Sequence, residues 1–475
     1  MTKTVIKHAT IATMDPAIGE LPAGDILIRD GRIEAVAPRI DTDAEVIDAT
    51  GMIAIPGLVD THRHTWQTAL RGLLADGVIP DYIRGVRLQM APRYRPEDMY
   101  WGNYAGALDA LNMGVTTIVD YCHNIVTPDH AHEAIRGLRD SGVRALYGHG
   151  LSPINENTFA DSASGQGQGA GAFQQRLATA RALRSEYFSS SDQRLTFGIC
   201  PQELLIAPPE EVAAEFATAR ELSARLVFHA NQVCVRQLFQ DVELLHSRGL
   251  LGPDLLLVHC TFNTRHEWEL LREHGVSVSV CPETEMQMGM GFPAIREATE
   301  YTAGPGIAID CVSGTGGDLI TEARLVLQAL RWRTDEPGYN NWLAPQQITW
   351  TTREALTWAT INGARCAGLD SVTGSLTPGK RADVVLLDAR SISMAGWNRL
   401  DPIGAVVAHM NAGNVHTVLV DGQVVKRDGA LVHVDTAAAI DGLESSRGYL
   451  MADAESEGGF IPQPPVDIPL YREHA

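Results

Sequence analysis

The feature that most constrains the fold of this chain is the alternation of short apolar runs with stretches of helical character through its middle. One run ends at Val59, and seven more follow as GVTTIVDY, VRALYGHG, RLTFGIC, RLVFHANQ, LLLVHC, VSVSVC and GIAIDC. Helical stretches lie between them, for example from His132 to Asp140 and from about 209 to 223. Eight buried strands that alternate with helices predict an α/β fold, a (β/α)8 barrel of the TIM type.

The two ends of the chain have a different pattern, in which apolar and polar residues alternate as in strands with one buried face. The segments are TVIKHATIAT and GDILIRDGRIEAVA near the start, and RADVVLLDA and NVHTVLVDGQVVKRDG near the end. Asp-Gly pairs at 30–31, 421–422 and 428–429 are strong signals for hairpin turns. We expect these ends to pair in one small β-structure.

The predicted organisation is therefore a composite β-sandwich of residues 1–56 and 370–432, with the barrel, residues 57–369, inserted between its halves. The Gly/Ser/Gln-rich stretch at 162–172 predicts a loop, either a lid or a plain flexible insertion. The tail, residues 433–475, has no strong period and could wrap the surface or reach a neighbouring subunit. We expect a homo-oligomer.

Composition narrows the class of partner. The 475 residues carry a formal net charge of −20, which argues against a nucleic-acid or anionic-membrane surface and favours a small-molecule substrate. No stretch of about eighteen apolar residues occurs, so we expect a cytoplasmic protein without membrane contact. The seven cysteines form no CxxC pair, which is typical of reduced thiols rather than a thiolate zinc site.

Imidazole and carboxylate side chains stand at the ends of four predicted strands. His62 and His64 follow the first strand, His229 the fifth, His259 the sixth and Asp310 the eighth. A barrel presents its active-site residues at these strand ends. Because such donors suit Zn²⁺, Fe²⁺, Mn²⁺ or Co²⁺ with a position left for water, the pattern predicts a metal centre.

Several motifs together resemble the amidohydrolase superfamily, specifically the cytosine-deaminase-like group with 8-oxoguanine deaminases, adenosine-type deaminases and triazine hydrolases. The resemblance covers nearly the whole chain and rests on PGLVDTHRHTWQTALRG, FHANQ, VHC, GIAID and LTWATINGARCAGLDSVTGSLTPGKRADVVLLDA. It implies a metal-dependent hydrolase of carbon–nitrogen bonds, of EC 3.5 type.

The resemblance also implies roles for the residues at the strand ends. His62, His64, His229 and Asp310 would bind the metal, and His259 would face the bound water or the polarised group of the substrate. A metal ion lowers the pKa of bound water from about 16 toward neutrality. Asp310 would then act as the general base and His259 would stabilise the developing oxyanion.

Lysine is confined to positions 3, 7, 380 and 426, so the predicted barrel contains none. Binuclear members of the superfamily bridge their metals with a modified lysine at the end of the fourth strand. We therefore expect one divalent metal ion per chain, with zinc preferred and iron, manganese or cobalt as alternatives.

The chain departs from the deaminase pattern at Gln232. Deaminases of this group usually have a glutamate three residues after the fifth-strand histidine, and an amide cannot take up and return a proton at neutral pH. Gln232 is therefore predicted to orient the substrate. Glu283 and Glu285, after the seventh strand, are candidates for a relocated proton shuttle, with Glu285 preferred; solvated loop charges are the alternative.

Further substrate-binding candidates are Trp66, Gln67, Arg71 and His123. An aromatic ring or guanidinium after the HxH motif could stack on a flat ring or bind a carboxylate. Helix packing and a surface ion pair are the alternatives for the first three. His123 ends the second strand, where substrate contact is expected.

The function predicted from the sequence is deamination of an N-heterocyclic small molecule by a mononuclear metal-dependent hydrolase. A second reading is hydrolysis of an amide, carbamate or cyclic amide, or displacement of another leaving group. A third is a non-catalytic barrel kept as a scaffold.

Overall fold

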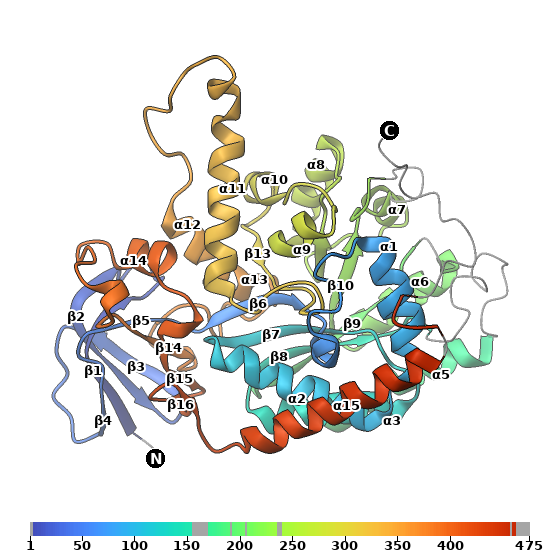
Figure 1. Cartoon of the computed structure of the whole chain (residues 1–475), viewed down its shortest axis with the longest axis horizontal. Helices are drawn as coiled ribbons and strands as arrows, with labels where there is room; N and C mark the ends of the chain where they lie inside the picture. Colours follow the sequence, from blue (N-terminus) through green and yellow to red (C-terminus); the bar gives the residue numbers. More distant parts are fainter. Residues whose placement is uncertain are drawn as a thin grey trace.

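The chain folds into two β-structures that lie side by side in space (Figure 1). The computed structural model describes residues 3–153, 170–190, 192–204, 207–234, 240–456 and 458–461. An eight-stranded sheet forms the middle of the chain, and a nine-stranded sheet combines its two ends. The predicted barrel with an additional β-rich unit is confirmed.

The barrel strands pair in parallel with their neighbours in chain order. They are β6 (Leu58–Arg63), β7 (Val115–Cys122), β8 (Arg144–Gly150), β9 (Leu195–Cys200), β10 (Arg225–Ala230), β11 (Leu255–His259), β12 (Ser277–Val280) and β13 (Gly306–Ile307). The ring closes where the Asp310 amide donates to the His62 carbonyl at 2.9 Å and the His64 amide donates to the Asp310 carbonyl at 2.8 Å. The first strand runs four residues beyond the predicted end at Val59, so His62 lies inside it.

Helices cover the outside of the barrel, as an α/β architecture requires. They include α2 (Pro96–Asn112), α3 (Pro128–Ser141), α5 (Ala170–Tyr187), α6 (Pro209–Glu221), α7 (Asp241–Ser247), α8 (Arg265–His274), α10 (Ile295–Tyr301), α11 (Leu319–Tyr339), α12 (Thr352–Thr357) and α13 (Gly363–Cys366). Proline stands in the first turn of α2, α3 and α6, where its missing N–H is not needed. The helices predicted around 132–140 and 209–223 are confirmed as α3 and α6.

Short elements follow several barrel strands and build the C-terminal face. They are η1 (Thr65–Leu70), α1 (Ile79–Asp81), η2 (Tyr82–Met90) and η3 (Ala91–Arg93) after the first strand, and α9 (Pro282–Gln287) after β12. The residues of η1 are all buried. This places the residues after the HxH motif inside the protein.

The second sheet has the order β17-β16-β15-β14-β5-β1-β2-β3, and β4 pairs with β1. Its strands are β1 (Lys3–Ala12), β2 (Glu20–Arg29), β3 (Arg32–Ala37), β4 (Glu45–Asp48), β5 (Met52–Pro56), β14 (Val384–Asp388), β15 (Val415–Val420), β16 (Gln423–Arg427) and β17 (Ala430–Leu431). All three predicted Asp-Gly turns are confirmed, and each has both residues at positive φ, for example 48° at Asp30 and 78° at Gly31.

Successive residues of the central strands of this sheet pack into two different hydrophobic cores. Ala54 and Leu386 pack with Ile6 in a core inside the sheet structure, whereas Ile53 and Leu387 belong to the large core shared with the barrel. This follows from the two-residue period of a strand, which points successive side chains to opposite faces.

A buried ion-pair cluster joins the barrel to the second sheet. The guanidinium of Arg144, at the start of β8, donates two hydrogen bonds to Asp383 at 2.7 and 3.0 Å and one to Asp421 at 2.6 Å. The Arg144 side chain is 2% exposed and that of Asp383 is fully buried. The motif PGKRADVVLLD thus supplies a carboxylate to the barrel as well as a strand.

The tail contains an element that its sequence pattern did not predict. Residues Thr436–Ser456 form α15, which packs along α2 and against η1 at the lower edge of Figure 1. Its buried apolar residues, among them Ala439, Leu450 and Ala454, do share one face, but Ile440 and Tyr449 lie outside that face and are exposed, so the amphipathic pattern in the sequence is weak. Of the loop predicted at 162–172, residues 162–169 lie outside the described residues, as do residues 462–475 of the tail. Within the described ranges, no helix has the length and apolar character to cross a membrane.

Candidate metal centre

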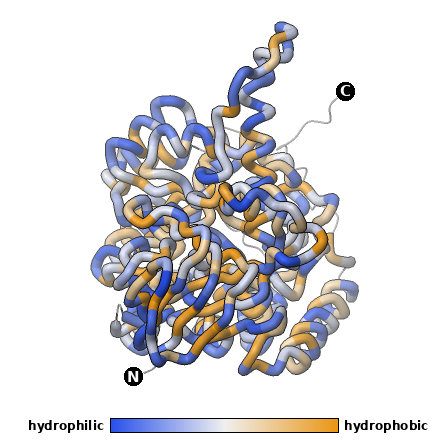
Figure 2. Tube along the Cα trace, turned by 90° about the vertical axis from the view of Figure 1, so that its left-hand side faces the viewer, coloured by the Kyte–Doolittle hydropathy of each residue, from blue (hydrophilic) through white to orange (hydrophobic). Residues whose placement is uncertain are grey.

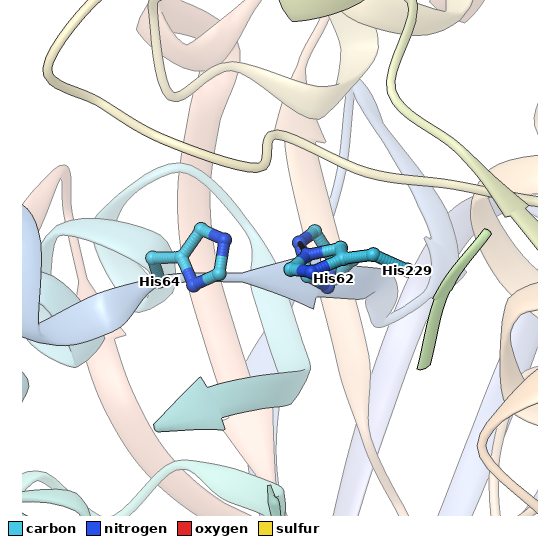
Figure 3. Close-up of side chains that lie close together, drawn as sticks. All are labelled: His62, His64 and His229. Atoms are coloured by element: carbon cyan, nitrogen blue, oxygen red, sulfur yellow. Dashed lines mark hydrogen bonds between the residues drawn. The ribbon is translucent and has the colours of Figure 1, made fainter. Parts of the chain in front are cut away.

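Four of the predicted ligands meet at the C-terminal ends of the barrel strands. His62 and His64 direct their Nε2 atoms to the same carboxylate oxygen, Asp310 Oδ1, at 3.2 and 3.3 Å. His229 Nε2 lies 3.3 Å from His62 Nε2. Figure 3 shows the three imidazoles close together: His62 comes from β6, His64 from the residue after β6, and His229 from β10. One nitrogen from each lies within 4.8 Å of the others, close enough to hold a single ion.

The backbone at the strand ends is held in a rare conformation. His259 has φ 74° and Asp310 has φ 64°, in the left-handed region that side chains other than glycine seldom adopt. Such residues cluster at functional sites, where the surrounding structure enforces them. Both side chains turn into the cluster as a result.

The protonation states suit metal ligands. Burial lowers the pKa of His62 well below its usual value and also lowers that of His229, so both imidazoles are neutral. Burial alone would raise the pKa of Asp310, but hydrogen bonds from His62 and His64 hold it well below its usual value. Neutral imidazole and ionised carboxylate are the forms that bind a divalent metal. These imidazole and carboxylate side chains are therefore in the protonation states that a divalent metal ion requires.

Two of the imidazoles are oriented by hydrogen-bond partners at their Nδ1 atoms, outside the cluster. His64 Nδ1 lies 3.0 Å from the Tyr121 carbonyl, and His229 Nδ1 lies 3.2 Å from Glu203 Oε1. Partners of this kind orient metal-binding histidines and set their tautomer. Glu203 was missed in the sequence, although it follows the strand RLTFGIC by three residues, a strand-end position like those that were considered.

His259 differs from the other histidines of the cluster. Its Nε2 is 3.9 Å from Asp310 Oδ2, and its Nδ1 is 3.1 Å from Glu285 Oε1. Burial alone would lower the pKa of His259, but the hydrogen bond to Glu285 and the charge of Asp310 raise it above its usual value. His259 is thus suited to donate a proton or hydrogen bond, whereas its neighbours are suited to bind metal.

Glu285 lies behind His259 and not beside the four predicted ligands. Its side chain is fully buried, and Oε1 accepts from both His259 and the Cys281 amide, the latter at 2.9 Å. Burial raises the pKa of the Cys281 thiol, so this thiol is a neutral neighbour. This position favours orientation of His259 over the predicted shuttle role. Glu283, the alternative, accepts from the Gly316 amide at 3.2 Å.

Three of the predicted substrate contacts lie next to the cluster. The His123 ring is 4.2 Å from that of His64, measured between centroids, and Trp66 Nε1 donates to His123 Nδ1 at 3.3 Å. Gln67 donates to the Tyr82 hydroxyl at 2.9 Å. Trp66 and Gln67 are fully buried, so they position His123 and Tyr82.

The prediction that Arg71 binds substrate is not supported by its position. Its guanidinium donates to Asp109 of α2 at 3.0 Å, and the side chain is 44% exposed. The structural reason is that η1 ends at Leu70, and Arg71 leaves that turn on the outer side. The alternative of a surface ion pair is the arrangement found.

Two further polar side chains come from the segments that follow β10 and β6. Gln232 is half-buried and follows β10 directly after Asn231, whose amide donates to Asp241 at 2.8 Å. Arg87 of η2 lies within electrostatic range of Glu203 and His123. Its Nη1 atom is buried and has no hydrogen-bond partner within the part of the chain that the structure describes. The sequence pattern gave no reason to single out Arg87.

Comparison with known proteins places this site in a family context. The amidohydrolase family model matches residues 53–425. The 5'-deoxyadenosine deaminase of Methanosarcina mazei is 26% identical over 469 residues, 96% of this chain and 100% of that protein. The 5-methylthioadenosine/S-adenosylhomocysteine deaminase of Moorella thermoacetica is 27% identical over 450 residues, 92% of this chain and 96% of that protein.

Solved structures share the fold. An adenosine deaminase from Xanthomonas campestris with bound zinc has a TM-score of 0.82 at 20% identity, covering 95% of this chain and 99% of its own. Atrazine chlorohydrolase TrzN from Arthrobacter aurescens TC1, complexed with zinc, has a TM-score of 0.81 at 21% identity, covering 94% and 100%.

Proposed function

Because the chain belongs to the amidohydrolase family, we propose that it is a metal-dependent hydrolase that replaces an amino group on a nitrogen heterocycle by oxygen and releases ammonia. The convergence of His62, His64, His229 and Asp310 at the barrel strand ends carries this proposal. The names of the deaminase relatives support the heterocycle as the substrate class.

The proposed metal is one zinc ion per chain, held by these four residues. Zinc is favoured by the three imidazoles and one carboxylate, and by the zinc named in both structural neighbours. A single ion is favoured because no lysine lies between His8 and Gly379 to bridge a second. When bound, zinc lowers the pKa of a coordinated water toward neutrality.

The chain's own residues divide the proton transfers and the orientation between them. Asp310 Oδ1 faces the two histidines of the HxH motif, which leaves Oδ2, on the side of His259, to accept the proton of the attacking water. His259 donates a hydrogen bond to the oxygen that the water adds to the attacked carbon. Protonated Asp310 then passes its proton to the amino group, which leaves as ammonia. Glu285 holds His259 in place and Glu203 holds His229.

The substrate would lie against His123 and Tyr82, with Gln232 and Arg87 as polar contacts. Arg87 offers a buried N–H that no described residue accepts, so a substrate with a ring carbonyl or an anionic substituent would satisfy it. We expect Arg87→Met to raise KM for such a substrate far more than it lowers kcat.

Gln232 favours a second candidate function. An amide cannot relay the proton that a ring nitrogen takes up in aromatic deamination. In hydrolysis of a cyclic amide or carbamate the negative charge develops on the former carbonyl oxygen, which His259 can stabilise, and Asp310 can pass the proton of the water to the leaving nitrogen, so these two residues would suffice. The same residues would then open a ring or release an amine instead of ammonia.

A substrate screen separates the two functions. The zinc-loaded protein is incubated with 5'-deoxyadenosine, 5-methylthioadenosine, aminopyrimidines, aminotriazines, cyclic amides and carbamates, and ammonia, amines and acids are measured. Ammonia from a heterocycle, abolished in Asp310→Asn, supports deamination. Ring opening or amine release without ammonia supports the second function. No product from any class would contradict both.

A further inference from the structure

Residues 458–461, which lie beyond the end of α15, pack on η2 at a position where η2 has no side chain. The Phe460 ring fills the notch that Gly85 leaves: a Cβ atom at residue 85 would lie only 2.9 Å from the ring atom Cζ and 3.2 Å from Cε1 and Cε2. Gln89 Nε2 donates to the Gly459 carbonyl at 3.1 Å. Both Gly85 and Gln89 are buried, so this side of η2 is covered by a ring and a hydrogen bond.

The other side of η2 faces the metal centre. η2 is a π-helix, whose hydrogen bonds join residues five apart and bring them to one side, so Tyr82 and Arg87 lie together. The Tyr82 ring lies 6.5 Å from that of His64, measured between centroids, and Arg87 is within electrostatic range of His123. Gly85 stands between Tyr82 and Arg87 in the sequence, about half a turn from each, and therefore faces away from the centre.

A π-helix of this length needs support from its surroundings. The π form is rare, and it occurs mostly as single turns within α-helices, often at functional sites. η2 extends over nine residues, Tyr82–Met90. A conformation that is seldom adopted persists where the surrounding structure enforces it. The packing on the Gly85 side thus contributes to holding Tyr82 and Arg87 toward the metal centre.

α15 adds contacts to the same region. It mixes hydrophilic and hydrophobic residues, as much of the chain does in Figure 2, so one face packs while charged groups extend from the others. Asp453 Oδ2 forms an ion pair with Arg93 Nε at 2.8 Å, and the Arg93 guanidinium donates to the Gln89 carbonyl in the last turn of η2. Arg447 donates to the Ala69 carbonyl of η1 at 3.2 Å. Carbonyls in the last turn of a helix lack partners within it, so these guanidinium groups stabilise both helix ends.

We propose that Phe460 is a positioning residue for substrate recognition, which packs on Gly85 and so holds η2 with Arg87 and Tyr82 directed to the substrate. Phe460 lies on the far side of η2 from the metal centre and acts through η2 without touching the substrate. The assignment of a substrate to Arg87 and Tyr82 rests on the proposed function, whereas the support of η2 is a property of the chain by itself.

Hydrogen–deuterium exchange of the full-length, metal-loaded protein without substrate tests the support of η2. Phe460→Ala should speed exchange over residues 82–90 at least about tenfold, because η2 then opens more often. Exchange over β11 should stay unchanged, which excludes a global loss of stability. Phe460→Leu keeps an apolar group over Gly85 and should restore most of the protection. Ile461→Ala is the matched control, because this neighbouring apolar residue is 38% exposed, and its exchange should equal that of the wild type.

Steady-state kinetics on a substrate found in the screen test whether this support reaches Arg87. Phe460→Ala should raise KM about tenfold with kcat and metal content nearly unchanged, because the hydrogen bond from a charged donor to the substrate is weakened. In the Arg87→Met background the same substitution should raise KM less than about threefold, because the group through which Phe460 acts is already gone. Ile461→Ala should leave KM unchanged.

The contact can also be tested from the side of η2. Gly85→Ala places a methyl group where the Phe460 ring packs, although alanine favours helices more than glycine does. It should therefore raise KM and speed exchange over residues 82–90, as Phe460→Ala does. In the Phe460→Ala background it should add nothing, because the ring that it displaces is absent.

Unchanged exchange or unchanged KM in Phe460→Ala, an Ile461→Ala variant that behaves like Phe460→Ala, or additive effects of Phe460→Ala and Arg87→Met would each overturn the proposal. An inactive wild type in the substrate screen would instead contradict the proposed function. The exchange over residues 82–90 would then still decide whether Phe460 supports η2, so the two failures are distinguishable.

Discussion

The hydrogen bond from His259 to Glu285 allows the role of a single charge to be tested. Both bonds that Glu285 accepts, from His259 Nδ1 and from the Cys281 amide, end on the same oxygen, Oε1. In Glu285→Gln the amide oxygen can accept both bonds, so these two bonds are kept while the negative charge is lost. The substitution therefore isolates the electrostatic contribution of Glu285.

The expected effect on the rate follows from this geometry. A hydrogen bond to a charged group contributes about 1.5–3 kcal/mol and a neutral one about 0.5–1.5 kcal/mol, so the loss is about 1–1.5 kcal/mol. At about 1.4 kcal/mol per factor of ten, kcat should fall about tenfold in Glu285→Gln, with KM and metal content nearly unchanged. Loss of a proton shuttle would instead lower kcat by about 10²–10⁴-fold.

The pH profile gives a second measure of the same bond. Glu285 contributes to raising the pKa of His259, and in the proposed mechanism the protonated imidazole is the active form. Activity should therefore fall as the pH rises through this pKa, and in Glu285→Gln the fall should begin at lower pH. Glu283→Gln, on the same short helix, should change neither kcat nor the profile. An unchanged rate and profile in Glu285→Gln, a loss of a thousandfold with metal retained, or loss of the metal would refute the positioning role.

Two further predictions concern stability. Arg144→Met leaves Asp383 and Asp421 without their buried cation, so the free energy of unfolding in urea should fall by about 3–5 kcal/mol, whereas Arg194→Met, which removes a partly exposed partner of Asp421, should cost at most about 1 kcal/mol. Equal effects of the two variants would contradict this. Burial raises the pKa of Asp241 to about 7, above its unfolded value of about 3.9, so the folded state binds the extra proton and its stability falls as the pH rises through that window. Asp241→Asn should lose this pH dependence, so the melting temperature of the variant relative to that of the wild type should be higher at pH 8 than at pH 5. The same difference in melting temperature at both pH values would contradict the prediction.

The barrel and its strand-end residues were predictable because buried parallel strands form apolar runs that sequence displays directly. The convergence of His62, His229 and Asp310 followed from the fold alone, since strand ends meet at one face of a barrel. The sequence could not predict which carboxylate contacts each histidine on the side away from the cluster. Glu203 reaches His229 because it follows β9, the neighbour of β10, and Glu285 reaches His259 because α9 follows β12, the neighbour of β11.

The other differences between the sequence predictions and the structure arise from local backbone geometry. Trp66 and Arg71 lie in one short stretch, and only the 3-10 turn η1 shows that the first points inward and the second outward. The helix α15 was not predicted because its exposed apolar residues, Ile440 and Tyr449, obscure the helical spacing of its buried ones. The exposure of Trp342 could not be predicted either, since an apolar residue in a sequence is expected to be buried.

Metal content measured together with activity tests the central claim most directly. Protein purified without chelator should contain about one zinc per chain by elemental analysis, and removal of the metal should abolish hydrolysis until zinc is returned. His62→Ala should lower both zinc content and activity, while Arg71→Ala, at the surface ion pair, should retain both. A firm stoichiometry of two ions would contradict the single-ion site, and full activity in metal-free protein would contradict metal-dependent hydrolysis altogether.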